Sequence, residues 1–226
     1  MNASLSTDIM KNSIVSPRWI ASVFVASLLV SICGLTGCLS RPALHKQTFT
    51  FNAPAISPGK VVAGDRVLGI RRLQVAPPFD ERSLVYRTGD FSYVRDPYAE
   101  FLDSPDEDMM APVRGWLRAN GGFRAVVENG SALPPNEMVE INVTQLFGDF
   151  RQREHPVAVM AMRFVFFDAP NGVPGKPILQ KEYSRSIPLS APTAAALVEG
   201  WDQALAGILA EVSLNLPPSG FGQASR

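Results

Sequence analysis

The stretch Met138-Val139-Glu140-Ile141-Asn142-Val143-Thr144-Gln145-Leu146-Phe147 decides the fold of this chain, because its apolar and polar side chains alternate. Successive side chains of a β-strand point to opposite faces, so this pattern predicts a sheet with one buried face and one wet face. A second run, Val157 to Phe167, is as long and more apolar. Each run is long enough to cross a whole sheet, and we expect the two to be its main strands.

Shorter β-rich runs surround these two strands in the sequence, at residues 66–75, 84–87, 91–94, 123–127 and 178–187. The first of them ends before Pro77-Pro78, which cannot donate to a sheet ladder. Thr88-Gly89-Asp90 separates the second and third runs and favours a hairpin between them.

Two segments have apolar residues at helical spacing. The first starts at Ser104-Pro105, should carry Trp116 on its apolar side and should end at Asn120-Gly121-Gly122. The second starts near residues 190–193 and carries Trp201. We expect both tryptophans in the core. Strands in groups around two helices, without strict alternation, predict a single α+β domain: a mostly antiparallel sheet with two helices packed against it.

The N-terminal segment has the form of a bacterial lipoprotein signal. An uncharged apolar run over residues 19–32 follows Lys11 and Arg18, and Leu35-Thr36-Gly37-Cys38 closes it. We therefore expect residues 1–37 to be a signal peptide and Cys38 to be lipidated. A transmembrane anchor is the alternative, but Ser and Gly residues leave the run short of the roughly 20 apolar residues that a span requires.

The remaining boundaries follow from composition. Residues 38–64 are rich in Pro, Ala, Ser and Gly and are predicted to be a lipidated N-terminus and flexible tether, with a short edge strand at Phe49-Thr50-Phe51. The ordered domain should cover residues 65–217. Residues 218–226 should form a disordered tail.

Charge and cysteine content exclude several classes of function. The chain has 21 basic and 21 acidic residues, and loss of residues 1–37 leaves a net charge of about −1, which argues against nucleic acid as a partner. The only cysteines are Cys33, in the signal peptide, and Cys38. The folded domain therefore has no thiol for a disulfide, a metal site or a nucleophile.

Candidate catalytic groups are few. His45 falls in the tether and His155 in a turn before Pro156, and neither position suggests a general base. The carboxylates Asp103, Asp106, Glu107 and Asp108 suggest either a metal cluster or acidic residues that favour a helix N-terminus. No serine stands in a Gly-x-Ser-x-Gly setting. We expect no catalytic residue, no metal and no cofactor.

Four aromatic residues stand out on the predicted hairpin and just after it: Tyr86, Phe91, Tyr93 and Tyr98. Such side chains supply large contact areas at interfaces, so they are the candidates for a partner-binding surface. The alternative, that they form one face of the core, stays open.

The order of these features resembles the ABC-type transport auxiliary lipoproteins, a Pqi-type family that accompanies MCE-domain lipid transporters. The resemblance rests on the lipobox, Phe49-Thr50-Phe51, residues 67–75, Leu84-Val85-Tyr86-Arg87 and the aromatic strand at 93–98. The final helix, which contains a tryptophan, belongs to the same pattern. Phe101 stands where family members usually have a tryptophan, so the subfamily is open.

The resemblance implies a role without a reaction. Family members are expected to dock, at the outer membrane, onto an MCE assembly that extends from an ABC permease and ATPase in the inner membrane. A homo-oligomer would suit a ring-shaped MCE partner. Leu39 agrees with the outer membrane, because Gram-negative lipoproteins retained at the inner membrane usually have Asp there. The alternatives are a periplasmic lipid carrier with an apolar cavity and a periplasmic hydrolase.

Overall fold

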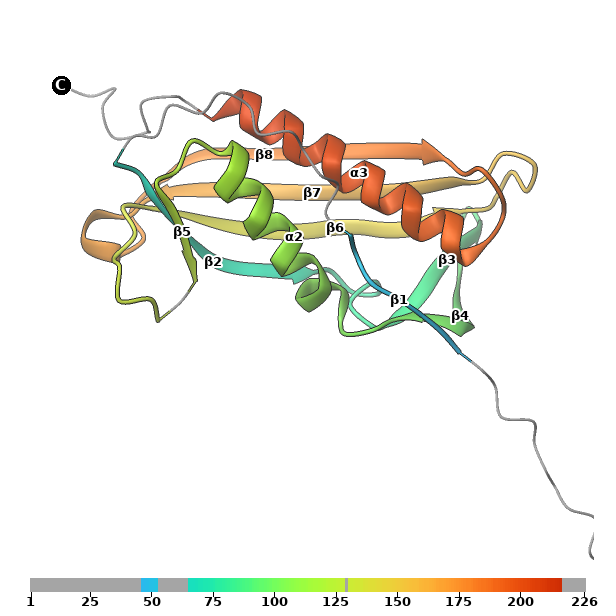
Figure 1. Ribbon diagram of the computed structural model, residues 1–226. Coiled ribbons are helices and arrows are strands. Elements are labelled where there is room, and N and C mark those ends of the chain that lie inside the picture. The colour runs from blue at the N-terminus through green and yellow to red at the C-terminus, as the bar shows by residue number, and fades with distance from the viewer. Residues whose placement is uncertain (1–45, 53–64, 129, 217–226) are drawn as a thin grey trace, which may run out of the picture. The chain divides into compact units, whose positions relative to one another are not determined.

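The computed structural model describes residues 46–52, 65–128 and 130–216 (Figure 1). The predicted signal peptide, Cys38, His45 and the tail from residue 218 lie outside these residues. The elements in chain order are β1 (Gln47–Phe49), β2 (Val67–Val75), β3 (Ser83–Gly89), β4 (Ser92–Phe101), α2 (Pro105–Asn120), β5 (Ala125–Glu128), β6 (Glu137–Asp149), β7 (Val157–Asp168), the 3-10 turn η1 (Pro170–Gly172), β8 (Pro177–Pro188) and α3 (Ala194–Asn215).

The eight strands form one sheet in the order β1-β4-β3-β6-β2-β5, with β7 on β6 and β8 on β7. The pairs β1–β4, β2–β5, β2–β6 and β3–β6 are parallel, whereas β3–β4, β6–β7 and β7–β8 are antiparallel. The prediction of a mostly antiparallel sheet is therefore wrong. After β2, the chain passes through β3, β4 and α2 and returns to the end of the sheet at which β2 began. Strands β5 and β6 therefore run in the same direction as β2.

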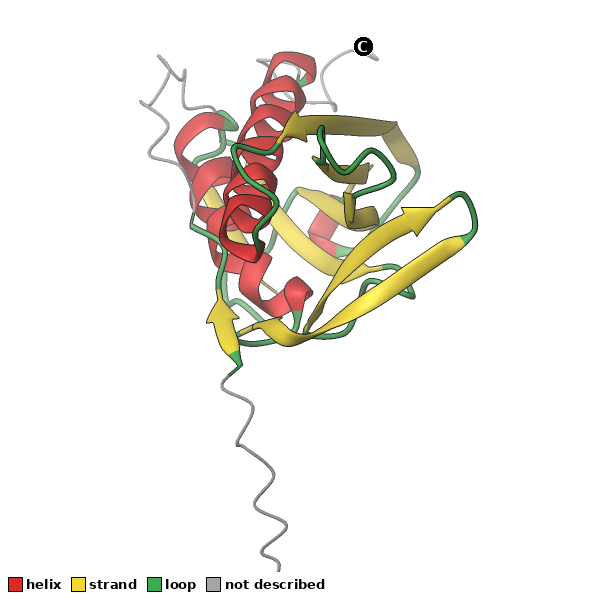
Figure 2. Ribbon diagram, turned by 90° about the vertical axis from the view of Figure 1, so that its right-hand side faces the viewer, coloured by secondary structure: helices red, strands yellow, loops and turns green. Residues whose placement is uncertain are grey.

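Both helices cover the same face of this sheet (Figures 1 and 2), as the α+β prediction expected. The buried side chains of β6 that face them are Val139, Ile141 and Val143. A bulge between Val143 and Gln145 then shifts the alternation, so that Gly148 faces the helices: a Cβ atom there would stand 3.0 Å from a methyl carbon of Leu197 in α3. Phe147 therefore points to the opposite face of the sheet, where its ring packs against Phe79 at 5.7 Å and Tyr93 at 5.5 Å between centroids.

Helix α3 begins where the sequence predicts. The Thr193 side chain accepts a hydrogen bond from the Ala196 backbone N–H at 3.2 Å, which caps the helix. Trp201 is buried, and its indole N–H donates to the Val159 carbonyl of β7 at 3.2 Å. Among the residues that the structure describes, no helix is both long and apolar enough to span a bilayer.

Residues 46–52 belong to the folded domain, and the short edge strand expected at Phe49-Thr50-Phe51 is present two residues earlier, as β1 at Gln47–Phe49. Strand β1 pairs with the end of β4, and Phe51 is only 5% exposed. Its ring stacks on Phe101 at 5.1 Å between centroids, and Phe101 stacks on Trp201 at 5.7 Å. The burial of the Phe51 side chain offsets the entropy cost of ordering this short segment.

A buried ion pair fixes the start of β2 against the start of β6. The Arg66 guanidinium donates two hydrogen bonds of 2.8 Å to the Glu137 carboxylate, and the Phe123 ring lies 4.5 Å from its central carbon. Both charged side chains are almost fully buried. The bidentate geometry offsets part of the cost of removing two charges from water.

Candidate functional site

The candidate site is built on the β3–β4 hairpin, which extends away from the helices (Figure 2). Gly89 pairs with Ser92, so Asp90 and Phe91 form the two-residue tip. The Phe91 side chain is 99% exposed. The hairpin predicted from Thr88-Gly89-Asp90 is present, and its most apolar tip residue faces water.

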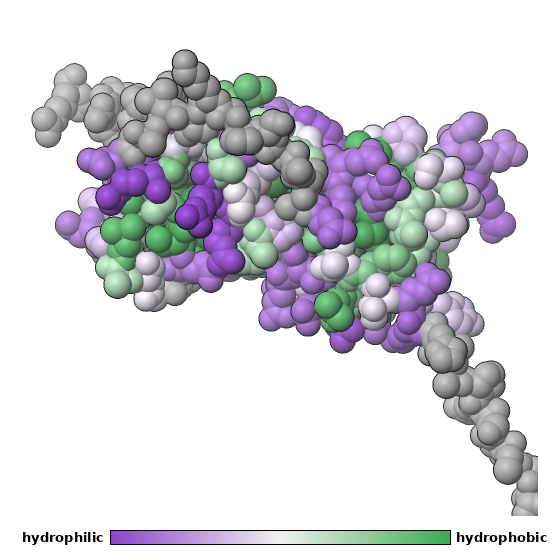
Figure 3. Space-filling model, in the orientation of Figure 1, coloured by the Kyte–Doolittle hydropathy of each residue, from purple (hydrophilic) through white to green (hydrophobic). Residues whose placement is uncertain are grey.

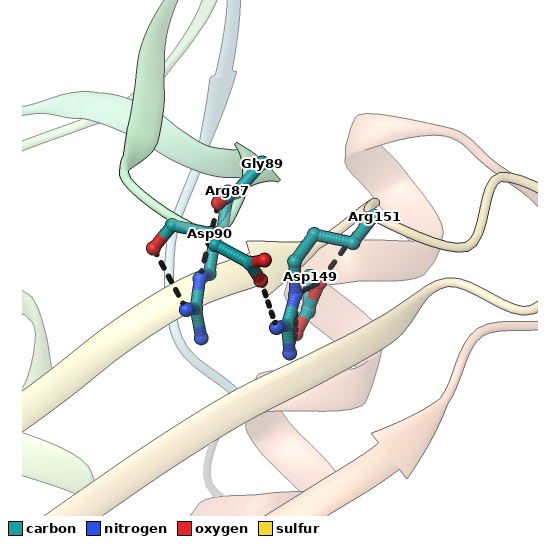
Figure 4. A network of polar contacts seen from close by, with 5 residues as sticks. All are labelled: Arg87, Gly89, Asp90, Asp149 and Arg151. Atoms are coloured by element: carbon teal, nitrogen blue, oxygen red, sulfur yellow. Dashed lines mark hydrogen bonds and ion pairs between the residues drawn. The ribbon is translucent and has the colours of Figure 1, made fainter.

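Two arginines hold this tip in place (Figure 4). Arg87 donates to the carbonyls of Gly89, at 3.3 Å, and Asp90, at 3.0 Å. Arg151, just after β6, bonds the Asp90 carboxylate at 2.9 Å and the Asp149 carboxylate at 2.7 Å. The hydrogen bonds from Arg151 hold the pKa of Asp149 below its ordinary value. We call these four residues, Arg87, Asp90, Asp149 and Arg151, the tip clamp.

Strand β4 is interrupted at Asp96-Pro97. Its pairing with β3 jumps from Val85↔Arg95 to Ser83↔Glu100. The Asp96 carboxylate organises the interruption, because it accepts hydrogen bonds from the Tyr98 backbone N–H at 2.7 Å and from the Tyr86 hydroxyl at 2.6 Å. Burial raises the pKa of Tyr86 well above its ordinary value, and the bond to Asp96 adds to this effect. The hydroxyl therefore stays protonated as a donor.

The four aromatic candidates do not lie on one surface. Tyr86 is half-buried and meets Phe150 edge-to-face at 5.1 Å. Tyr93 lies on the other face of the hairpin, where its ring packs against Phe147 at 5.5 Å. Tyr98 lies beyond the interruption of β4 and is 56% exposed. Together with Phe91 at the exposed tip, the four aromatic candidates therefore have four different surroundings.

A hollow of about 440 Å³ lies beside Tyr86, and we call it the hairpin groove. Its lining residues are Tyr86, Thr88, Val94, Phe150, Arg153 and Pro192. The edge-to-face pair of Tyr86 and Phe150 gives it an aromatic wall. Arg153 is exposed and makes no ion pair with any residue that the structure describes. The groove can therefore accept an apolar side chain with a carboxylate close to it.

The acidic residues and the histidine considered as catalytic candidates lie at a helix N-terminus and on the surface. Asp106, Glu107 and Asp108 lie in the first turn of α2, where acidic residues favour the helix dipole. His155 lies beside the tip clamp in a second hollow of about 400 Å³, and it is exposed. Within residues 46–52, 65–128 and 130–216, no group of three or more His, Cys, Asp and Glu residues could hold a metal ion.

The hairpin groove and the tip clamp were missed by the sequence-based reasoning. Asp149 ends β6, and Phe150, Arg151 and Arg153 lie in the connection to β7; nothing in their spacing pairs these residues with residues 86–94. The available signal was weak. Arg87 precedes the predicted turn and Asp90 is its last residue. A charged pair at a turn can support the hairpin through side-chain hydrogen bonds.

Comparison with known proteins identifies the family. The model of the ABC-type transport auxiliary lipoprotein component matches residues 48–213, and the match therefore begins within β1. The chain belongs to this family. It is a lipoprotein auxiliary component of ABC-type transport systems, as the resemblance implied. No curated protein matches the chain.

Two crystal structures share the fold of this auxiliary lipoprotein. One, of a protein from Xanthomonas campestris, has a TM-score of 0.62 and 14% sequence identity over 74% of this chain and 92% of that one. The other, of an uncharacterized protein, has a TM-score of 0.59 and 14% identity over 76% of this chain and 99% of that one. At such identity the similarity concerns the fold alone.

Proposed function

We propose that this auxiliary lipoprotein is the non-enzymatic, lipid-anchored subunit of a transenvelope MCE/ABC-type lipid transport system. It docks an MCE-domain protein and its ABC permease and ATPase complex at the outer membrane. Membership of the family supports a transporter as partner. Acylation of Cys38 supplies the anchor, and Leu39 after it favours the outer membrane.

The exposed tip of the hairpin is the observation that carries this proposal. A fully exposed phenylalanine gains no burial energy in the isolated domain, yet the tip clamp holds it on a fixed support. Interfaces concentrate their binding energy in a few aromatic and arginine side chains around a pocket. Phe91, the aromatic wall of the hairpin groove and the unpaired Arg153 form such a set within one end of the domain.

Co-purification from native membranes tests the docking surface. The full chain is crosslinked and recovered through a C-terminal tag, and the bound MCE protein is quantified. Phe91→Ala and Arg153→Glu should each lower that amount several-fold, because one removes the tip side chain and the other reverses the charge of the groove. Val173→Ala is the matched control, because Val173 is 64% exposed and follows η1, at the opposite end of β7 from the connection that contains Arg153.

Two results would contradict the docking role. One is the absence of MCE protein from the wild-type sample. The other is an equal recovery with Phe91→Ala and with Val173→Ala. Melting temperatures of the variants should match that of the wild type, since the altered side chains are exposed, and they control for misfolding.

A separate experiment tests which membrane holds the lipoprotein. Leu39→Asp creates the usual retention signal of Gram-negative lipoproteins, so it should move the protein from outer-membrane to inner-membrane fractions of a density gradient. A wild-type chain already found in the inner-membrane fraction would overturn the outer-membrane part of the proposal.

The packing of the core favours docking over the carrier alternative. A carrier needs an apolar cavity between the sheet and the helices. In the described residues this layer holds large side chains with almost no exposure, among them Trp201, Phe101, Phe164 and Phe166. Native mass spectrometry of gently extracted protein should show no stoichiometric phospholipid, and the same spectra report whether the chain forms the proposed homo-oligomer.

A further inference from the structure

The point at which the chain enters the domain is rigidly fixed. Strand β1 pairs in parallel with β4, with Gln47 opposite Ala99 and Phe49 opposite Phe101. The Lys46 ammonium forms an ion pair of 2.7 Å with Glu100. Together with the buried ring of Phe51, these contacts make β1 a fixed part of the sheet edge.

Further hydrogen bonds join β1 to the helices and to the end of β4. The Leu102 backbone N–H donates to the Phe49 carbonyl at 2.7 Å. The Thr50 hydroxyl donates to the Asp108 carboxylate of α2 at 3.2 Å, and the Asn52 backbone N–H donates to Asp202 of α3 at 3.1 Å. A constraint applied at the N-terminus of β1 is therefore passed to the end of β4, which follows Tyr98, and to Leu102.

The length of chain before β1 limits how far this edge can lie from an acylated Cys38. Eight peptide units separate Cys38 from Lys46, and at about 3.5 Å each they reach no more than about 28 Å. Strand β6 alone, with 13 residues, is about 43 Å long. The edge formed by β1 and the end of β4 is thus the part of the domain that the anchor holds nearest to the bilayer.

This edge presents apolar surface. Tyr98 of β4 is 56% exposed and alternates with the buried Ala99, and Leu102, which directly follows the buried Phe101 at the end of β4, is 54% exposed. Arg82, like Lys46, pairs with Glu100 close to them. In Figure 3, hydrophobic residues reach the surface among hydrophilic ones where β1 and β4 lie in Figure 1. Tyrosine prefers the interfacial region of a bilayer, where its ring is buried and its hydroxyl remains hydrated.

The patch is too small for a protein partner. A stable protein interface buries about 800 Å² on each side and includes about 20–30 residues. Two side chains cannot form its core, but a bilayer needs no matching shape. The interruption of β4 at Asp96-Pro97 also separates this patch from the hairpin, which runs away from β1 (Figure 2).

We propose that Tyr98 and Leu102 form a membrane-contacting patch, which rests in the headgroup region of the bilayer that holds the acylated Cys38. The contact orients the domain so that Phe91 and the hairpin groove face away from this bilayer, toward a protein partner. This inference rests on the lipid anchor of the proposed function.

Fluorescence quenching in vesicles tests the patch. The sequence has no cysteine after Cys38, so a cysteine introduced into the lipidated chain is a unique labelling site. Tyr98→Cys and Leu102→Cys are compared with Phe91→Cys and Val173→Cys. Each variant carries a polarity-sensitive fluorophore in vesicles of phosphatidylethanolamine and phosphatidylglycerol that contain a headgroup-attached quencher. We expect quenching at positions 98 and 102 to be several-fold stronger than at positions 91 and 173.

The outcomes separate the patch from the anchor. An acylated chain with equal quenching at all four positions overturns the patch and leaves the anchor intact. Quenching restricted to position 91 also overturns it, because the hairpin tip would then face the bilayer. Shielding of position 98 only when the MCE protein is added assigns the patch to a protein partner instead. An intact mass without acyl chains, with no protein recovered on the vesicles, contradicts the anchor and with it the patch.

Discussion

Replacing Gly200 with alanine tests how closely α3 lies on the sheet. A Cβ atom at Gly200 would stand 2.7 Å from the Cβ of Ala158 on β7 and 3.0 Å from a methyl carbon of Leu189. The leucine side chain can rotate away, but the alanine Cβ is fixed to its strand. Carbon atoms in contact normally stay about 3.5–4.0 Å apart, so the helix and the strand must separate by about 1 Å.

Two effects of opposite sign determine the result. Alanine improves on glycine inside a helix by about 1 kcal/mol. Overpacking of a dense core costs about 1–3 kcal/mol, and a clash between two backbone-fixed atoms belongs in the upper part of that range. We expect Gly200→Ala to lower the free energy of unfolding by about 1–2 kcal/mol, or the melting temperature by about 2–8 °C in a domain of this size.

Gly115 of α2 is the matched control. It also lies inside a helix, but a Cβ there would meet nothing within 4 Å. Gly115→Ala should therefore raise the melting temperature by about 1–4 °C. Urea unfolding of both variants, and of Gly200→Ala combined with Ala158→Gly, completes the experiment. The reasoning is refuted if Gly200→Ala is as stable as Gly115→Ala, or if Ala158→Gly destabilises as much in the Gly200→Ala background as alone.

Three other perturbations have definite expected results. Burial raises the pKa of Asp202 to about 6, so its contribution to stability is complete below its unfolded value near pH 4 and is lost as the pH rises through 6. Asp202→Asn should remove this pH dependence, measured as the difference between the urea midpoints at pH 4.5 and 7.5. At pH 7.5 the variant should have a free energy of unfolding about 1 kcal/mol higher than the wild type, once solvent screening is allowed for. Glu137→Ala leaves the Arg66 charge buried and should cost about 3–5 kcal/mol in urea unfolding, more than the double replacement of Arg66 and Glu137 by methionine. Arg151→Ala removes the link between Asp90 and Asp149, so amide hydrogen exchange should accelerate at residues 88–92 while the global melting temperature stays unchanged. Exchange rates at these residues equal to those of the wild type would show that the tip clamp does not restrain the tip.

The sequence predicted the elements of the fold better than their pairing. The period of two in residues 138–147 and the helical spacing around Trp201 are local properties, and both elements are present. Parallel pairing depends on residues far apart in the chain. Strand β1 is three residues long, and it is ordered because Phe51 stacks on Phe101, fifty positions later. No pattern within residues 46–52 contains that information.

The candidate site was predicted in part for the same reason. The exposure of Phe91 follows from its place in a turn, which Gly89 marks in the sequence. Tyr93 is packed because the bulge in β6 turns Phe147 toward it, and Tyr98 is set apart because Asp96 bonds Tyr86 across the hairpin. The Asp96-Pro97 pair was a visible sign of an interruption. Its effect on the neighbouring aromatics depends on contacts between strands.

Strand β1 has a mechanical consequence for a protein held by its N-terminus. Force from an acylated Cys38 would act along β1, parallel to β4, and would strain the hydrogen bonds of the pair together in shear instead of opening them one by one. The ring of Phe51 lies behind these bonds and must leave the core before the strand can slide. Strand β1 should therefore resist a pull from Cys38 better than it would resist the same force applied from its side.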